Sequence, residues 1–253
     1  MTDGNTGTVK SVETMFEVIE VLRKRDGARV TTIAEELGLS KSAVHKHLST
    51  LRNHRFAVQE GDEYRLGLGF FGYGSYVRTR YDVFRKAKPL VRELADETGE
   101  MVWLITEENG MGMYLFGDGG SLDVNVDSLV GSWRHLHLNS GGKAILSRLP
   151  EDRVADIVDR HGLPRRTEAT ITDPDALFDE LETVRERGYA LNLAEDMTGI
   201  HAVGVPIIHR DRVRGALSIA GAANRLTEER LHEEYADRLL TAVNDLELNL
   251  TYR

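Results

Sequence analysis

Apolar residues recur with the period of an α-helix in three successive segments near the N-terminus. The first segment, Ser11–Lys24, ends before Gly27 and predicts one long helix. Its apolar stripe consists of Val12, Met15, Phe16, Ile19 and Leu22. The second segment predicts a short helix with a capping box formed by Thr32 and Glu35. Its apolar face consists of Ile33, Ala34 and Leu37.

A third helix follows a tight turn at Gly38-Leu39-Ser40, with Ser40 as its N-cap. The residues expected to face the core are Val44, Leu48 and Leu51. Two short helices joined by such a turn are the helix-turn-helix pattern. The opposite face of the third helix carries polar and cationic side chains that suit base edges and phosphates in the major groove of DNA. These candidate DNA-binding residues are Lys41, Ser42, His45, Lys46, Ser49 and Arg52.

Two strand-like runs, Phe56–Gln59 and Tyr64–Leu66, come directly after the third helix and predict a hairpin. A hairpin at this place is the wing of a winged helix, and its Arg65 is a further candidate contact to the DNA backbone. The turn between the strands is acidic and repels phosphate, so we do not expect the wing to insert deeply into the minor groove. The acidic residues of the turn are Glu60, Asp62 and Glu63.

The next segment, Gly67–Arg80, combines helical spacing with several glycines. Its apolar positions are Phe70, Tyr73, Tyr76 and Val77. Each interior glycine costs up to ~1 kcal/mol relative to alanine, so this helix requires packing, which a partner subunit can supply. The alternative is a flexible linker. A further helix is expected over Val83–Thr98, with a bend or restart at Pro89. Its apolar stripe consists of Leu90, Val91, Leu94 and Ala95.

From Met101 the period changes to that of strands, and strands then alternate with helices to the C-terminus. The turn Glu107-Glu108-Asn109-Gly110 predicts a hairpin between the first two strands. The expected strands are Met101–Thr106, Met111–Phe116, Leu122–Val126, Tyr189–Leu193, Ala202–Ile208 and Val213–Ala220. The expected helices are Gly141–Leu149, Asp152–His161, Pro174–Arg187 and a last one capped by Thr227. This order indicates an α+β domain.

Composition narrows the class of protein. The chain has 253 residues, a formal net charge of −9 and no cysteine, which excludes disulfides, thiolate metal sites and cysteine nucleophiles. No signal peptide or membrane-spanning run is visible, so we expect a cytoplasmic protein without a membrane partner. The 25 arginines against 7 lysines, together with the acidic balance, resemble haloarchaeal proteins from a salt-rich cytoplasm. An ordinary acidic cytosolic protein is the equal alternative.

The charge is unevenly distributed. Residues 1–68 carry 10 basic and 10 acidic groups, and the rest of the chain carries the whole excess of acid. Within the neutral part, Lys41–Arg55 contains four cations, three histidines and no acid. Such a basic run favours an anionic partner, although a solvated helix face is the commoner meaning of four charges in fifteen residues.

Taken in order, these elements resemble the IclR family of transcriptional regulators over nearly the whole chain. Three segments carry the resemblance: VTTIAEELGLSKSAVHKHLSTL, LHLNSGGKAIL and VRERGYALNLAEDMTGIHAVGVPIIHRDRVRGALSIAG. The resemblance implies a winged helix-turn-helix over residues 1–68, linker and dimerisation helices over 69–98, and a GAF-like effector-binding domain over 99–253. It also implies an effector that is a small organic acid, a carboxylate, or a sugar-derived metabolite.

The resemblance places the effector site between the sheet and its neighbouring loops. The matching positions are Asn139, Ser140, Gly141, Asn192, Ala202, Ser218 and Ala220. Backbone N–H groups of Ser140 and Gly141 at a helix start suit an anion. Asn192 stands where relatives can have an acid, and the two alanines stand where larger or more polar residues occur. The alternatives are structural: Asn139 as a cap, Ser218 as a packed small residue, and Glu195 and Asp196 as solvated loop charges.

Other chemistry has less support. His135 and His137 could hold a metal with His201 or His209, but no ligand spacing indicates it, and His137 matches a structural histidine of the family. No phosphate loop, nucleophile elbow or paired carboxylates are evident, so we expect no cofactor and no enzyme. The resemblance therefore implies a ligand-responsive regulator of a catabolic operon that binds a palindromic operator as a homodimer or dimer of dimers. A winged-helix interaction module without DNA binding is the alternative, and a small-molecule enzyme is a more distant one.

Overall fold

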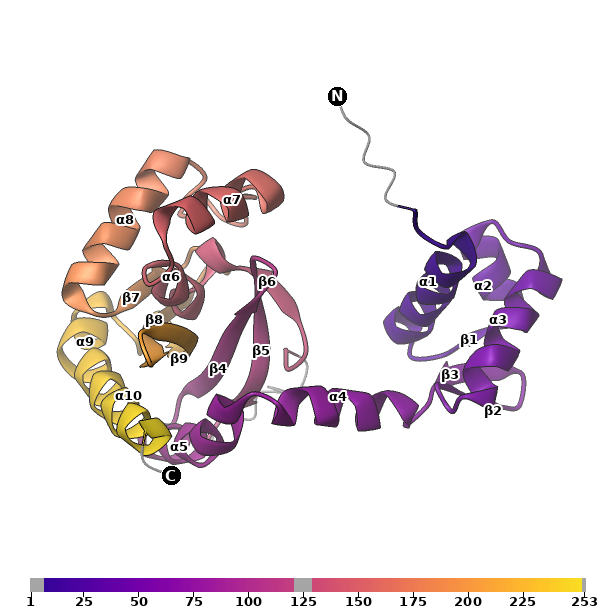
Figure 1. The fold of residues 1–253 in the computed structure, drawn as a ribbon, viewed down its shortest axis with the longest axis horizontal. Coiled ribbons are helices and arrows are strands. Elements are labelled where there is room, and N and C mark those ends of the chain that lie inside the picture. Colours follow the sequence, from indigo (N-terminus) through magenta and orange to yellow (C-terminus); the bar gives the residue numbers. More distant parts are fainter. Residues whose placement is uncertain (1–6, 121–128, 252–253) are drawn as a thin grey trace. The chain divides into compact units, whose positions relative to one another are not determined.

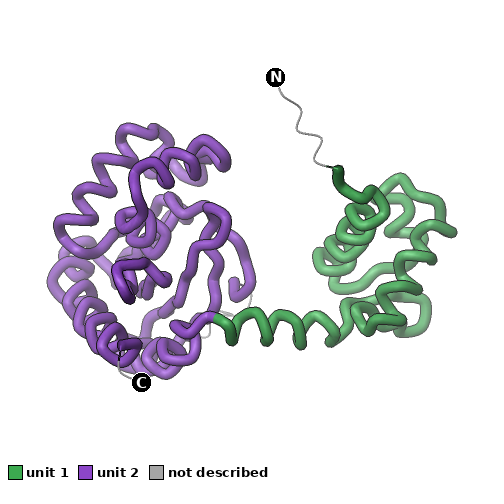
Figure 2. The backbone as a smooth tube through the Cα atoms, in the orientation of Figure 1, with its two compact units in different colours: residues 1–80 green, residues 81–253 purple. Residues whose placement is uncertain are grey.

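The chain forms two compact units, residues 1–80 and 81–253 (Figure 2). The computed structural model describes residues 7–120 and 129–251, and the expected strand Leu122–Val126 lies outside them. Each unit has its own hydrophobic core. No helix in the described part of the chain is long and apolar enough to cross a membrane.

The first unit contains the predicted helix-turn-helix. Its elements are α1 (Lys10–Arg25), β1 (Ala28–Arg29), α2 (Val30–Leu37), α3 (Lys41–Asn53), β2 (Ala57–Glu60), β3 (Glu63–Leu66) and α4 (Gly69–Thr79) (Figure 1). Gly38 ends α2 in the left-handed region at φ 64°, and the Ser40 hydroxyl accepts a 3.2 Å hydrogen bond from the Ala43 N–H at the start of α3. The predicted turn and N-cap are therefore confirmed.

The predicted wing is also confirmed as an antiparallel hairpin of β2 and β3. The sheet has a third strand that the sequence did not reveal, in the order β1-β3-β2. That strand pairs only Ala28 and Arg29 with β3, which is too short a run to show an alternating pattern.

Two expectations for the first helices are wrong. Val12 and Phe16 remain 43% and 59% exposed, because all the buried residues of α1 lie in its second half, where the core of the unit meets it. The expected capping box is absent. Arg29 pairs with β3, so the chain enters α2 directly at Val30 and leaves Thr32 inside the first turn.

Two glycines fix the start of α4. A Cβ atom on Gly67 or Gly69 would lie 2.5 or 2.6 Å from the carbonyl oxygen of Arg55. The Gly69 N–H donates a 3.0 Å hydrogen bond to the same oxygen. The predicted helix exists, but no residue of α4 is buried within the unit. Part of the glycine content of this segment therefore serves close backbone approach, and the helix itself has an open apolar surface.

The second unit is built on a six-stranded antiparallel sheet in the order β6-β5-β4-β9-β8-β7. The strands are β4 (Met101–Glu108), β5 (Met111–Asp118), β6 (Trp133–His135), β7 (Ala190–Leu193), β8 (Ile200–His209) and β9 (Arg212–Ala222). The first hairpin turns at Asn109 and Gly110, which have φ values of 55° and 85°, as the sequence predicts. The last strand of the chain, β9, inserts between β4 and β8 and joins the two halves of the sheet.

Helices cover both faces of this sheet (Figure 1). They are α5 (Asp82–Thr98), α6 (Ser140–Leu146), α7 (Glu151–His161), α8 (Pro174–Arg187), α9 (Glu228–Arg230) and α10 (Ala236–Thr251). Helices α5 and α10 pack on the face that carries Val102 and Leu104. Helices α6, α7 and α8 pack on the face that carries Trp103 and Ile105. The alternation along β4 thus fills two separate cores.

Two details differ from expectation. Of the predicted bend or restart at Pro89, the restart is absent: helix α5 runs through the proline, and Ala87, Val91 and Leu94 on both sides of it are buried in one core. Thr227 caps the last helical segment as predicted, but the π-helical turn Leu231–Tyr235 separates α9 from α10. Together the two units confirm the predicted fold class: an N-terminal winged helix-turn-helix followed by an α+β domain consistent with a GAF-like fold.

Candidate DNA-binding and effector sites

The outer face of α3 is the candidate DNA-binding surface. Val44, Leu48 and Leu51 are buried, with at most 1% of each residue exposed, and they fix the rotation of the helix on the core. All six residues predicted on the outer face are exposed. They lie on the side of the helix opposite to its buried residues. The six are Lys41, Ser42, His45, Lys46, Ser49 and Arg52. The helix therefore offers a continuous polar and cationic face.

Arg65 on the wing has a different environment. Its guanidinium lies 3.2 Å from carboxylate oxygens of both Asp26 and Glu60, and 3.8 Å from one of Glu63. Three carboxylates thus surround one cation. Its contact with the DNA backbone stays a prediction.

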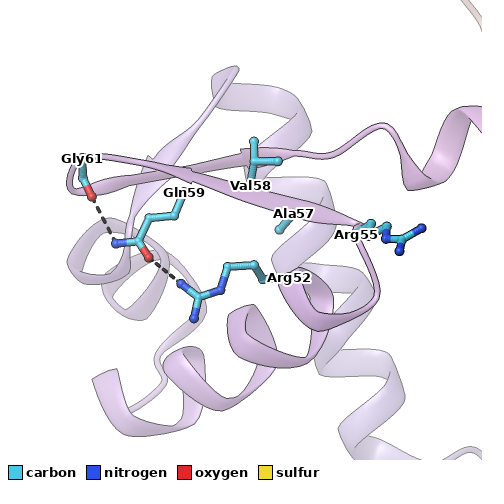
Figure 3. Close-up of a pocket in the computed structure, with 6 residues that line it drawn as sticks. All are labelled: Arg52, Arg55, Ala57, Val58, Gln59 and Gly61. Carbon is cyan, nitrogen blue, oxygen red and sulfur yellow. Dashed lines mark hydrogen bonds between the residues drawn. The ribbon is translucent and has the colours of Figure 1, made fainter.

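A groove of about 490 Å³ lies between the end of α3 and the wing (Figure 3). It is lined by Arg52, Arg55, Ala57, Val58, Gln59 and Gly61. Arg52 donates a 2.7 Å hydrogen bond to the Gln59 side-chain oxygen, and the Gln59 amide donates a 3.1 Å bond to the carbonyl of Gly61. Arg55 belongs to the basic run that the sequence shows, but Gln59 was not among the predicted DNA-binding residues. The strand pattern of this segment, in which Ala57 is buried, predicts a wing at this place but does not indicate a role for Gln59.

The candidate effector site begins where α6 meets the sheet. Asn139 caps this helix, and its side-chain oxygen accepts a 2.7 Å hydrogen bond from the Gly142 N–H. The hydroxyls of Ser140 and Ser218 lie 2.9 Å apart and are both buried. Gly204 on β8 is needed here, since a Cβ atom on it would lie 2.5 Å from the Ser140 carbonyl carbon. The start of α6 therefore packs directly on β8 and β9.

The remaining predicted effector residues are neighbours across the sheet. Asn192 pairs in register with Ala202, which pairs with Ala220. Ala202 and Ala220 belong to the same core as α6. The Asn192 amide donates to the Leu138 carbonyl at 2.5 Å, and its oxygen accepts from the Glu195 N–H at 3.1 Å. The structure thus brings all seven predicted positions to one region, in which the four polar side chains already have protein partners.

The expectation that Glu195 is a solvated loop charge is wrong. Glu195 is only 7% exposed, and its carboxylate lies 2.7 Å from the Nζ atom of Lys143, which is 1% exposed. Glu180 lies 3.2 Å from the same ammonium group. Asp196 is half-buried rather than solvated and lies 3.6 Å from Arg166.

Burial raises the pKa of Glu195 above its ordinary value, and the attraction of Lys143 opposes that rise. The loop that carries Glu195 is held by the Thr170 hydroxyl, which donates a 2.6 Å hydrogen bond to the Glu195 carbonyl. The sequence signal that could have found this cluster is Lys143 itself, a lysine in a segment otherwise suited to burial. A buried ammonium group requires carboxylate partners.

The histidines have local partners. His137 is buried, its Nε2 atom lies 3.3 Å from the Pro164 carbonyl, and burial lowers its pKa to about 4. The ring of His135 stacks edgewise on it, with centroids 5.8 Å apart. Within residues 7–120 and 129–251 no three His, Asp or Glu side chains are grouped as metal ligands.

Comparison with known proteins identifies both units. Residues 11–61 match the model of the IclR helix-turn-helix domain, and residues 75–248 match the model described as bacterial transcriptional regulator IclR C-terminal. The chain is 30% identical to the probable HTH-type transcriptional regulator ArcR of Halobacterium salinarum, over 98% of this chain and 96% of that protein. It is 29% identical to the acetate operon repressor of Salmonella typhimurium, over 90% of this chain and 85% of that protein.

The fold agrees with these matches. The crystal structure of the Thermotoga maritima IclR superposes with a TM-score of 0.82 and 30% identity, covering 96% of this chain and 99% of that one. These relatives are transcriptional regulators, not enzymes. The resemblance that the sequence motifs indicated is therefore confirmed, and the chain belongs to the IclR family of DNA-binding transcriptional regulators with effector domains.

Proposed function

We propose that this protein is a ligand-responsive, sequence-specific regulator that places α3 in the major groove of an operator. The observation that carries the proposal is the exposed polar face of α3, held in place by a fully buried apolar face. Lys41, Ser42, His45, Lys46, Ser49 and Arg52 make the contacts, and Arg65 adds a wing contact. Because the cationic groups are few, base contacts carry much of the affinity, which suits a salt-rich cytoplasm.

The operator is a palindrome bound by a homodimer or a dimer of dimers. Support comes from α4, an 11-residue, glycine-containing helix that has no fully buried residue in its own unit. Such a helix is marginal in isolation. Leu68, directly before the helix, and four residues of the helix form an exposed apolar surface. Their exposed fractions are 87% for Leu68, 70% for Phe71, 68% for Tyr73, 66% for Tyr76 and 47% for Val77. A second copy of the chain covers this surface in our proposal, with residues 69–98 acting as linker and dimerisation helices.

The effector is a small carboxylate or a sugar-derived metabolite, and it binds among Asn139, Ser140, Gly141, Asn192, Ala202, Ser218 and Ala220. Support comes from their gathering on one face of the sheet from α6, β7, β8 and β9. The target is a catabolic operon, in line with a relative named for the acetate operon. Effector binding changes operator affinity through its differential affinity for two arrangements of the subunits.

Fluorescence anisotropy tests the DNA-binding proposal. The purified protein is titrated onto a labelled duplex from upstream of its own gene, at several salt concentrations and with random-sequence competitor. We expect binding that resists the competitor and that weakens with added salt. Binding no tighter than to random DNA, confirmed by a genome-wide search for bound sites, contradicts the proposal and favours a winged-helix interaction module.

Reversal of one charge locates the contact surface. Lys46→Glu reverses a cation at the centre of the outer face of α3 and is expected to abolish specific binding without unfolding the protein. Glu35→Lys is the matched control, since Glu35 is an exposed residue of α2 outside the outer face of α3. Retained operator affinity in Lys46→Glu would remove α3 from the interface.

A further inference from the structure

The groove between α3 and the wing contains Arg52, a cation whose charge no carboxylate of the described residues neutralises. Arg52 bonds to the neutral amide of Gln59, while Arg65 lies among three carboxylates. Within residues 7–120 and 129–251 no carboxylate pairs with Arg52 or Arg55. A guanidinium has five N–H donors, so one bond to Gln59 leaves four for an anion. Unlike Arg65, Arg52 therefore keeps its charge and most of its donors available for a phosphate.

Gln59 joins two elements that belong to one binding surface. Figure 3 shows its side chain between Arg52, which comes from α3, and Gly61, which comes from the wing turn. The chain of two hydrogen bonds, 2.7 and 3.1 Å long, fixes the direction of the arginine relative to the wing. A free arginine side chain loses rotamer entropy when it is immobilised. Holding it in place before binding removes part of that cost from the complex.

We propose that Gln59 is a positioning residue that aims the Arg52 guanidinium at a single backbone phosphate of duplex DNA in the groove between α3 and the wing. This inference rests on the proposed DNA-binding function. Arg55 lines the other end of the same groove, beyond Ala57, and adds positive charge there. The neutral amide is essential to the arrangement, because a carboxylate at position 59 would hold the arginine equally well and cancel its charge.

Four full-length variants test this: Gln59→Met, Gln59→Glu, Arg52→Met and the double variant Gln59→Met/Arg52→Met. Affinity is measured by anisotropy on two duplexes of equal length, one from upstream of the protein's own gene and one of random sequence. We expect Gln59→Met to weaken binding to both duplexes about three- to tenfold. Arg52→Met should weaken it further and lower the salt slope by about one.

Coupling between the two residues separates positioning from a purely structural role. In the Arg52→Met background, Gln59→Met should change affinity less than about twofold, since there is no guanidinium left to aim. Gln59→Glu should keep the melting temperature of the wild type and still lose at least as much affinity as Arg52→Met. An equal effect of Gln59→Met in both backgrounds, or wild-type affinity of Gln59→Glu, overturns the inference.

The two duplexes distinguish this inference from the proposed function. Preference for the upstream duplex without Arg52–Gln59 coupling refutes the inference alone. Equal affinity for both duplexes with full coupling supports the phosphate contact, and it refutes sequence-specific regulation when a genome-wide search also finds no preferred site. Failure of the wild-type chain to bind either duplex at low salt refutes both.

Discussion

The buried ion pair of Lys143 and Glu195 predicts that loss of the single ammonium group strongly lowers the stability of the protein. Lys143→Met keeps the aliphatic stem of the side chain and removes only the ammonium group. Glu180 retains Arg187 at 3.3 Å. Glu195 retains only a weak 3.5 Å bond from the Leu193 N–H to Oε1, and its Oε2 atom is buried without a partner. The variant therefore leaves one uncompensated buried carboxylate.

Breaking a buried ion pair in this way costs about 3–5 kcal/mol. For a unit of this size, that corresponds to a fall in melting temperature of roughly 10 °C. The assay is chemical and thermal denaturation of the full-length protein, monitored in the unit formed by residues 81–253. Lys88→Met is the matched control: Lys88 makes a contact with the Phe116 ring at 5.5 Å and should cost less than about 1 kcal/mol.

Two further measurements make the reasoning refutable. Adding Glu195→Gln to Lys143→Met removes the unpaired charge and should restore at least half of the lost stability. Since burial raises the pKa of Glu195 in the folded state, and the loss of Lys143 raises it further, the folded variant takes up a proton before the unfolded chain does. Its deficit should therefore shrink as the pH falls from ~7 to ~5. A deficit below about 1 kcal/mol, or no rescue by Glu195→Gln, would falsify the account.

The remaining predictions concern packing, the effector and assembly. Gly142→Ala places a Cβ atom 2.1 Å from the Leu136 carbonyl oxygen and should destabilise the protein by several kcal/mol. Gly72→Ala in α4 has open space around it and should be neutral or stabilising. Equal melting temperatures of the two variants would contradict this prediction. Ser218→Leu should abolish the effector response and leave operator binding intact, and an unchanged response would remove Ser218 from the effector site. The double variant Phe71→Ser/Tyr76→Ser should shift the protein towards monomers in sedimentation velocity. An unchanged oligomeric state would show that α4 does not form the dimer interface.

Local rules account for the parts of the fold that the sequence predicted well. The turn at Gly38, the cap at Ser40 and the Asn109-Gly110 hairpin are each decided within a few residues, so their backbone angles and hydrogen bonds follow from side-chain chemistry alone. The outward face of α3 was also predictable, because burial of every third or fourth residue fixes the direction of all the others.

The errors have a common physical cause. Phe16 has the right spacing for a core residue, yet it is 59% exposed, because the buried residues of α1 all lie in the second half of the helix. Thr32 has the right residue type for a cap, but a two-residue strand pair starts the helix earlier. In both cases the pattern was compatible with more than one answer, and contacts with distant segments selected among them.

The sequence by itself determined the two-part organisation of this protein, the helix-turn-helix and the polar face expected to contact DNA, because helix periodicity and capping act over short distances. Only the tertiary structure decided that β9 lies between β4 and β8, that Ser140 meets Ser218, and that Lys143 is buried against Glu195. Ser140 and Ser218 are 78 positions apart in the sequence, and Lys143 and Glu195 are 52 positions apart. Such contacts depend on which surfaces the whole chain can bury together, and no local pattern encodes that choice.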